Sequence, residues 1–147
     1  MINIAIIPID NRPICYDLIR DILSIDKNIN VYMPDLNILG GLHSVSDIES
    51  IFSFIENLPP VDYFIISLDT LAYGGLINSR RSSDDIETIK KRIEKFKILI
   101  PKKSKILAFS SIMRISNNNI NEEEKEYWSE YGKKIFEWSY NGCKEVC

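Results

Sequence analysis

Three short polar clusters, far apart along the chain, carry the side chains best suited to chemistry. They comprise Asp10, Asn11 and Arg12 in the first cluster, Asp69, Tyr73, Gly74, Gly75 and Arg80 in the second, and Ser110, Ser111 and Arg114 in the third. Two carboxylates placed close together can act as an acid/base pair or bind a cation. Arginine suits the bidentate binding of a carboxylate or a phosphate. We therefore predict Asp10 and Asp69 as catalytic residues, and as substrate-binding residues Arg12, Tyr73, Gly74, Gly75, Arg80 and Arg114.

Each of these residues also has a purely structural interpretation, which the sequence leaves open. Asp10 and Arg12 could form an ion pair that fixes a turn, and Asp69 could hydrogen-bond the backbone of its own loop. Tyr73 could pack its ring and expose its hydroxyl, while the arginines could neutralise buried acids. His43 is the single histidine, and it is more typical of a loop residue than of a base.

The clusters follow short apolar runs that have the character of buried strands. We expect four strands, at residues 2–7, 29–33, 61–67 and 105–110. Their nearly continuous apolar composition is typical of strands covered on both faces of a parallel sheet. Apolar residues at helical spacing predict helices between and after the strands, at residues 14–24, after a capping box Ser46-x-x-Glu49, and after Ser82 to Asp85, with a last helix that opens at Glu122 to Glu124.

This alternation predicts an α/β fold, with a parallel sheet and alternating helices in four β-α units that form a single domain over residues 1–147. A Rossmann-like open sheet is favoured, and half of a (β/α)8 barrel is the alternative. In both architectures ligands bind at the carboxyl ends of the strands. Because the three clusters follow the first, third and fourth strands, a parallel sheet would bring them to one edge. This convergence is the strongest argument for a site.

Composition and charge narrow the class of protein. The 147 residues are 45% hydrophobic and 27% charged, which is ordinary for one globular domain. The net charge of -3 gives no reason to expect nucleic acid or an anionic membrane as a partner. No apolar run is long enough to cross a bilayer, and the first residues lack the basic start of a secretory signal. We therefore expect a cytoplasmic protein whose partner is a small polar molecule or a glycan.

Several motifs with well-understood chemistry are missing from the sequence. There is no G-x-G-x-x-G after the first strand and no P-loop, which argues against a dinucleotide or nucleoside triphosphate site. No serine lies in a G-x-S-x-G elbow, so a serine nucleophile is not expected. The cysteines lack the spacing of a metal site and are expected to be free thiols; they are Cys15, Cys143 and Cys147. We predict no cofactor and no structural metal, and the sequence leaves a bound divalent cation open.

Two stretches are similar to the signatures of one protein family. Ile7-Pro8-Ile9-Asp10-Asn11-Arg12-Pro13 with Tyr16-Asp17 resembles a PLDDRP…YD opening, and Ser67 to Leu76 with Ser79-Arg80 resembles SLDMLxYGGLxxSR. A weaker intervening pattern is matched by Leu39-Gly40-Gly41, Met113-Arg114 and Tyr127-Trp128 with Tyr131-Gly132. On these residues the chain resembles, over nearly its whole length, an uncharacterised bacterial family catalogued as domain of unknown function 4127. The resemblance implies no activity, because the family has none assigned.

The chain departs from the pattern of that family in two respects. Asn11 stands where the family has a second acid, so this position supplies no carboxylate. The family's members are also much longer, so the resemblance implies that this chain is an N-terminal portion. Such a portion would be inactive if the remainder completes the site. It would also expose an apolar patch beside the fourth strand or the last helix.

Two functions from different classes fit these observations. The first is an enzyme, a hydrolase or group-transfer catalyst, that uses Asp10 and Asp69 on a polar small molecule or a glycan. Glycoside hydrolysis is the version to test first, because it needs two carboxylates and no cofactor. The second is a non-catalytic domain that binds a small molecule or an anion through its arginines. The sequence predicts neither the substrate nor the oligomeric state.

Overall fold

The computed structural model describes residues 1–100 and 102–146, and the side chains up to residue 142. Cys143 and Cys147, which were expected to be free thiols, therefore lie outside the described side chains, whereas Cys15 is a free thiol. The chain divides into two compact units, Met1–Ser111 and Ile112–Cys147. Each unit is described by itself below.

The first unit is built on a four-stranded sheet. Its strands are β1 (Ile2–Ile7), β2 (Ile29–Tyr32), β3 (Tyr63–Ser67) and β4 (Lys105–Phe109). All neighbouring pairs are parallel, and the strand order is β2-β1-β3-β4. The predicted α/β class and parallel sheet are confirmed. The sheet is open, which agrees with the Rossmann-like architecture.

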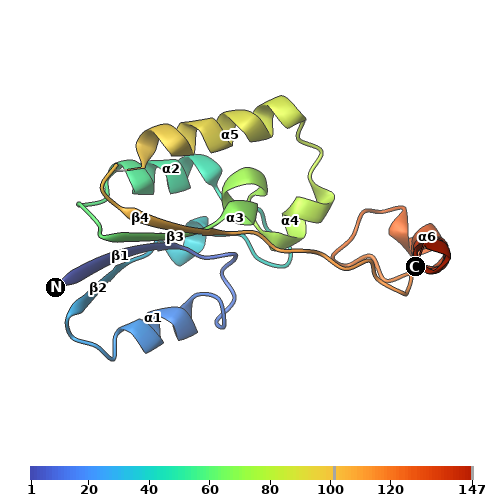
Figure 1. Cartoon of the computed structure of the whole chain (residues 1–147), viewed down its shortest axis with the longest axis horizontal. Coiled ribbons are helices and arrows are strands. Elements are labelled where there is room, and N and C mark those ends of the chain that lie inside the picture. The colour runs from blue at the N-terminus through green and yellow to red at the C-terminus, as the bar shows by residue number, and fades with distance from the viewer. Residues whose placement is uncertain (101, 147) are drawn as a thin grey trace. The chain divides into compact units, whose positions relative to one another are not determined.

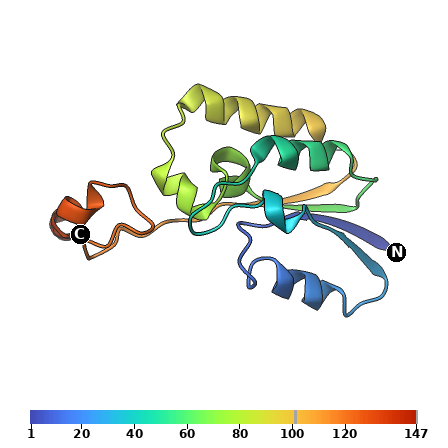
Figure 2. The ribbon, with the colours of Figure 1, turned by 180° about the vertical axis from the view of Figure 1, so that it is seen from behind.

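Helices cover both faces of the sheet. Figures 1 and 2 show α1 on one face and α2 with α5 on the other, while α3 and α4 lie beyond the carboxyl end of β3. Their bounds are α1 Asp17–Leu23, α2 Ile48–Glu56, α3 Leu68–Tyr73, α4 Leu76–Arg81 and α5 Ile86–Leu99, with a short 3-10 helix, η1, at Leu36–Ile38. None of the described helices is both long and apolar enough to pass through a bilayer.

The core lies between the sheet and the layer formed by α2 and α5. Phe52 of α2, Phe64 of β3 and Phe96 of α5 are all at most 4% exposed, and the rings of Phe64 and Phe96 lie 5.7 Å apart with planes at 59°. Tilted aromatic pairs of this kind add to the free energy gained by burying the rings. This core fixes the central strands, whose carboxyl ends carry the polar clusters.

One helix cap differs from the prediction. Asp47, not Ser46, caps α2, because its side chain accepts a hydrogen bond from the backbone N–H of Ser50 at 3.1 Å. The hydroxyl of Ser46 is already occupied, since it accepts a hydrogen bond from the N–H of Gly40 at 2.7 Å. The predicted capping box was therefore wrong by one residue. Asp85 caps α5 in the same way as Asp47 caps α2.

The second unit contains one long helix, α6 (Trp128–Val146). The helix begins after the predicted acidic start, because Glu122 to Glu124 lie in turns that precede it. Trp128 is buried at 7% exposure, but Tyr127, Tyr131 and Trp138 are 53%, 44% and 81% exposed. Helical spacing of aromatic residues is typical of core contacts, but of these four residues only Trp128 is buried. Helical spacing identifies the apolar face of a helix but not whether another element covers it.

Candidate functional site

The two central strands define the place where a ligand site is expected in this topology. From β1 the chain moves outward to β2, and then returns past β1 to β3, so the direction of winding reverses between β1 and β3. In open α/β sheets ligands bind at such a switch point, outside the carboxyl ends of the strands. The sequence did not reveal the strand order, and hence did not reveal where this reversal lies.

Asp10 and Asp69 follow the two strands that flank the switch point. Ile7 of β1 and Ile66 of β3 are partners in the register, and each aspartate comes three residues after its strand partner. Both carboxylates are buried, with Asp10 at 3% and Asp69 at 4% exposure. The structure thus brings the two predicted catalytic residues to the same edge of the sheet, beside neighbouring strands.

Asp10 forms an ion pair with Arg12 in the turn after β1. Its Oδ2 lies 2.8 Å from Nε and 2.6 Å from Nη2 of Arg12, and its Oδ1 accepts a hydrogen bond from the Arg12 backbone N–H at 3.1 Å. The Arg12 side chain remains 43% exposed, against 4% for that of Asp10. The structural interpretation of this pair is therefore correct, and it also leaves the arginine on the surface with a fixed orientation.

Cys15 belongs to the same group of side chains. Burial raises the pKa of the Cys15 thiol above its ordinary value of 9.0, and a hydrogen bond to Asp10 and the negative charge of Asp10 raise it further. The Arg12 guanidinium acts in the opposite direction. No motif spacing associates this cysteine with the first cluster, because it meets Asp10 across a turn.

Asp69 is held by the third cluster rather than by its own loop. Its Oδ2 accepts a hydrogen bond from the backbone N–H of Ser111 at 2.8 Å, and its Oδ1 accepts one from the Ser110 hydroxyl at 3.2 Å. Ser67, which precedes α3, supplies the cap of that helix, with Oγ 3.3 Å from the Thr70 nitrogen. The second and third clusters therefore meet at Asp69, on the side of β3 that faces β4.

The segment that follows Asp69 is helical, although the sequence indicated a loop. Helices α3 and α4 have six residues each, which is too short for an apolar period to be visible. Gly74 and Gly75 separate them with positive φ values of 83° and 132°, a region that favours glycine. A Cβ on Gly74 would lie 2.4 Å from Cγ1 of Val45. This glycine pair thus has a structural requirement of its own.

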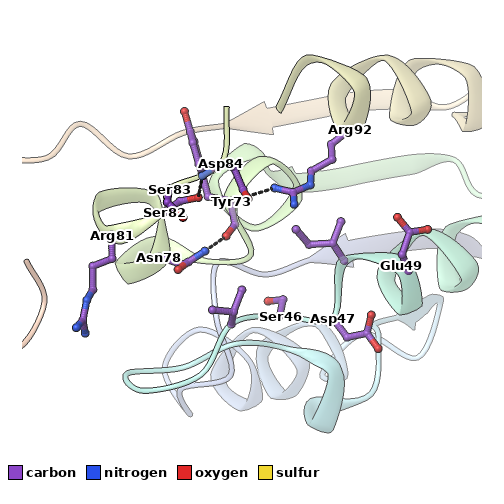
Figure 3. A pocket seen from close by; sticks show the side chains of 12 residues that line it. Ser46, Asp47, Glu49, Tyr73, Asn78, Arg81, Ser82, Ser83, Asp84 and Arg92 are labelled. Atoms are coloured by element: carbon purple, nitrogen blue, oxygen red, sulfur yellow. Dashed lines mark hydrogen bonds and ion pairs between the residues drawn. The ribbon is translucent and has the colours of Figure 1, made fainter. Parts of the chain in front are cut away.

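Tyr73 lines a polar hollow of about 490 Å³ on the side of the sheet where α2 and α5 lie (Figure 3). The hollow is bounded by the start of α2, by α4 and by the segment before α5; its polar lining residues are Ser46, Asp47, Glu49, Tyr73, Asn78, Arg81, Ser82, Ser83, Asp84 and Arg92. Figure 3 shows the Arg92 side chain directed at Asp84, while Arg81 extends away from that pair. Asn78 donates its side-chain amide to the Tyr73 carbonyl.

Arg92 crosses from α5 to the end of α3. Its Nη1 lies 2.7 Å from the Ala72 carbonyl and 2.6 Å from Oδ2 of Asp84, and this hydrogen bond lowers the pKa of the Asp84 carboxyl. Sequence reasoning missed this residue because Arg92 lies on the charged face of α5, and such a face is usually solvated. The sequence does not indicate that the Arg92 side chain donates to the backbone carbonyl of Ala72, twenty residues earlier.

The remaining predicted residues lie at different places. Arg80 is in α4, partly buried, and Arg114 is an exposed residue of the second unit, which is described apart from the sheet. His43 lines a separate hollow of about 250 Å³ together with Arg81. Within the part of the chain that the structure describes, no three acidic, histidine or cysteine side chains gather as they would around a metal ion.

Comparison with known proteins places the chain in a family, and the description of that family names no activity. None of the curated proteins and none of the solved structures matches the chain. A family model described as a protein of unknown function, DUF4127, matches residues 4–146, which is nearly the whole chain, and the chain belongs to this family.

Proposed function

We propose that the edge of the sheet between β1 and β3 is the active site of a hydrolase or group-transfer enzyme that acts on a polar small molecule or a glycan. The observation that carries the proposal is the burial of two carboxylates, Asp10 and Asp69, beside the switch point of a parallel sheet. Buried carboxylates are rare unless they are paired or used. Their coincidence at the place where this topology binds ligands supports a function for both.

The contacts of the two aspartates suggest different roles. Asp69 accepts one hydrogen bond on each oxygen, and an ionised carboxylate has lone pairs for more. We assign Asp69 as the residue that exchanges a proton with the substrate or attacks it. Asp10 orients Arg12, whose side chain is 43% exposed and would hold an anionic or hydroxyl-rich group. Within the first unit, Tyr73, Gly74, Gly75 and Arg80 remain proposed substrate contacts.

The experiment combines turnover with binding. The full chain would be assayed against para-nitrophenyl glycosides and para-nitrophenyl phosphate, with binding of glucuronate and inorganic phosphate followed by NMR. For an enzyme, Asp69→Asn should lower turnover by about a hundredfold or more and leave binding largely intact. Asp62→Asn is the matched control, since Asp62 precedes β3 at the opposite edge of the sheet and accepts a hydrogen bond from Asn3.

A second candidate function is a domain that binds an anion without catalysis. It is favoured by one observation, that both oxygens of Asp10 contact Arg12, which makes Asp10 an anchor for the arginine rather than a proton carrier. In this case the assays would show phosphate or glucuronate binding without turnover, and Arg12→Ala would abolish that binding. Unchanged turnover in Asp69→Asn would reject Asp69 as the catalytic residue, an absence of turnover in the parent chain would reject the enzyme, and binding that survives Arg12→Ala would reject the anion site.

A further inference from the structure

Thr70 occupies an unusual position for a threonine in a helix. It lies in α3, directly after Asp69, and it is 0% exposed. Threonine hydroxyls inside helices commonly bond to a carbonyl in the preceding turn of the same helix. The Thr70 hydroxyl instead lies 2.7 Å from the Pro8 carbonyl and 2.9 Å from the Ile9 carbonyl. It therefore joins the helix that carries Asp69 to the loop that carries Asp10.

These two carbonyls need a partner from outside their own strand. β1 ends at Ile7, so the residues that follow leave the hydrogen-bond ladder of the sheet. Pro8 is fully buried, and a buried carbonyl without a partner is unfavourable. The single proton of the Thr70 hydroxyl satisfies both oxygens as a shared hydrogen bond.

The loop after β1 is held on its other side as well. The backbone N–H of Asn11 donates to the Gly40 carbonyl at 2.9 Å, and the Asn11 side chain donates to the Leu39 carbonyl at 3.4 Å. Asp10 thus lies between two tethered neighbours. Ile9 is fixed to Thr70, and Asn11 is fixed to the segment that follows η1.

We propose that Thr70 is a positioning residue of the site, and that its hydroxyl sets the placement of Asp10 and its partner Arg12 relative to Asp69. The inference rests on the proposed function for its purpose, but the hydrogen bonds that carry it do not depend on any substrate. It explains why a polar side chain occupies a fully buried position beside the carboxylate.

The test compares two substitutions in the full chain by NMR. Thr70→Val removes the hydroxyl and keeps the branched shape, whereas Thr70→Ser keeps the hydroxyl and loses the methyl group. We expect Thr70→Val to speed hydrogen exchange of the Asn11 and Arg12 amides by about tenfold and to shift the Arg12 Nε–H resonance. Thr70→Ser should restore both readouts, while the Ile51 amide in the core stays unchanged in both variants.

Two results would overturn the inference. One is a Thr70→Val spectrum in which the Asn11, Arg12 and Arg12 Nε–H signals match those of the parent chain. The other is a change in Thr70→Ser as large as that in Thr70→Val or larger, because serine keeps the hydroxyl and loses only the methyl group, so the hydroxyl would not be what holds the loop. If Thr70→Val does not fold, Thr70→Ser can be compared with Thr70→Ala. The Asn11 and Arg12 amides should then stay protected from exchange in Thr70→Ser and lose this protection in Thr70→Ala.

The outcome can be separated from that of the proposed function. None of the NMR readouts needs a ligand, so an absence of turnover and of phosphate binding would remove the proposed function and leave the Thr70 contact in place. Conversely, loss of turnover in Asp69→Asn together with unchanged Arg12 signals in Thr70→Val would remove the positioning role and leave the function.

Discussion

The backbone N–H of Ser111 donates a hydrogen bond to Oδ2 of Asp69 at 2.8 Å, across 42 residues of sequence. This contact ties the end of β4 to the first turn of α3, so Asp69 has a structural role whatever its chemistry. A loss of function in an Asp69 variant is informative only if the fold survives. The first prediction therefore concerns stability.

We expect Asp69→Ala to lower the free energy of unfolding by about 1–3 kcal/mol, because the Ser111 N–H then loses the oxygen that accepts its hydrogen bond. Ser110→Ala removes only the hydroxyl bond to Oδ1 and should have a smaller effect, about 0.5–1.5 kcal/mol. Urea unfolding at pH 7 measures both. Equal stability of Asp69→Ala and the parent chain would contradict the assigned contact.

The second prediction concerns the ion pair after β1. Arg12→Ala leaves the buried Asp10 carboxylate without its guanidinium, so we expect a loss of about 1–3 kcal/mol of unfolding free energy. The double variant Asp10→Asn/Arg12→Ala should recover part of the loss, because no unpaired charge stays buried. Arg12→Lys should recover little, since an ammonium cannot form the two-pronged contact. A double variant less stable than Arg12→Ala would reject this account.

The strands and the edge where the polar residues gather could be predicted from the sequence. The run from Ile2 to Ile7 matches β1, because a buried parallel strand is nearly all apolar and therefore distinct from its surroundings. The parallel direction of the neighbouring strands could also be predicted, because strands and helices alternate along the chain. The convergence of Asp10, Asp69 and Ser111 at one edge is a consequence of that topology.

The strand order and the local contacts could not be predicted. Order depends on the direction in which each connection crosses the sheet, and no residue type records that direction. Thr70 lies in an apolar stretch and resembles a core residue, so nothing indicated that it bonds to the loop after β1. Ser46 and Asp47 are both good caps, and only the bond from Gly40 to Ser46 decides between them.

The third prediction concerns the reactivity of Cys15. Its raised pKa leaves less thiolate at pH 8, so alkylation by iodoacetamide should be slower in the folded chain than in the chain unfolded by urea. Asp10→Asn removes the nearby negative charge and should speed the reaction of the folded chain. Mass spectrometry of the Cys15 peptide separates this thiol from the others. A rate that does not respond to Asp10→Asn would contradict the contact.

The fourth prediction concerns the glycine pair. Gly74→Ala should be strongly destabilising, because the left-handed backbone costs about 1–2 kcal/mol and the new Cβ overlaps Val45. Gly75→Ala meets its nearest atom, the Ile9 carbonyl oxygen, at 3.6 Å, so it should suffer the backbone cost alone. The double variant Val45→Ala/Gly74→Ala should recover the steric part. Thermal unfolding ranks the variants, and an equal loss at both glycines would count against the Val45 contact.

The fifth prediction concerns acid. Hydrogen bonds from Ser50 lower the pKa of Asp47, and hydrogen bonds from Thr88 lower that of Asp85, below an ordinary value of 3.8. A carboxyl with a lower pKa in the folded state binds fewer protons there than in the unfolded chain, so stability rises with pH across this range. Its contribution is present above pH 3.8 and is lost as the pH falls through the folded value.

Urea unfolding between about pH 5 and pH 3 should therefore show a falling free energy of unfolding. The matched control is Asp47→Asn/Asp85→Asn, because asparagine keeps the capping oxygen but does not titrate. This variant should have a shallower slope with pH than the parent chain and similar stability at pH 3, where the aspartates of the parent are largely protonated in the unfolded chain. A slope as steep as that of the parent would assign the acid sensitivity to other carboxylates, with the Asp84 pair to Arg92 as the next to test.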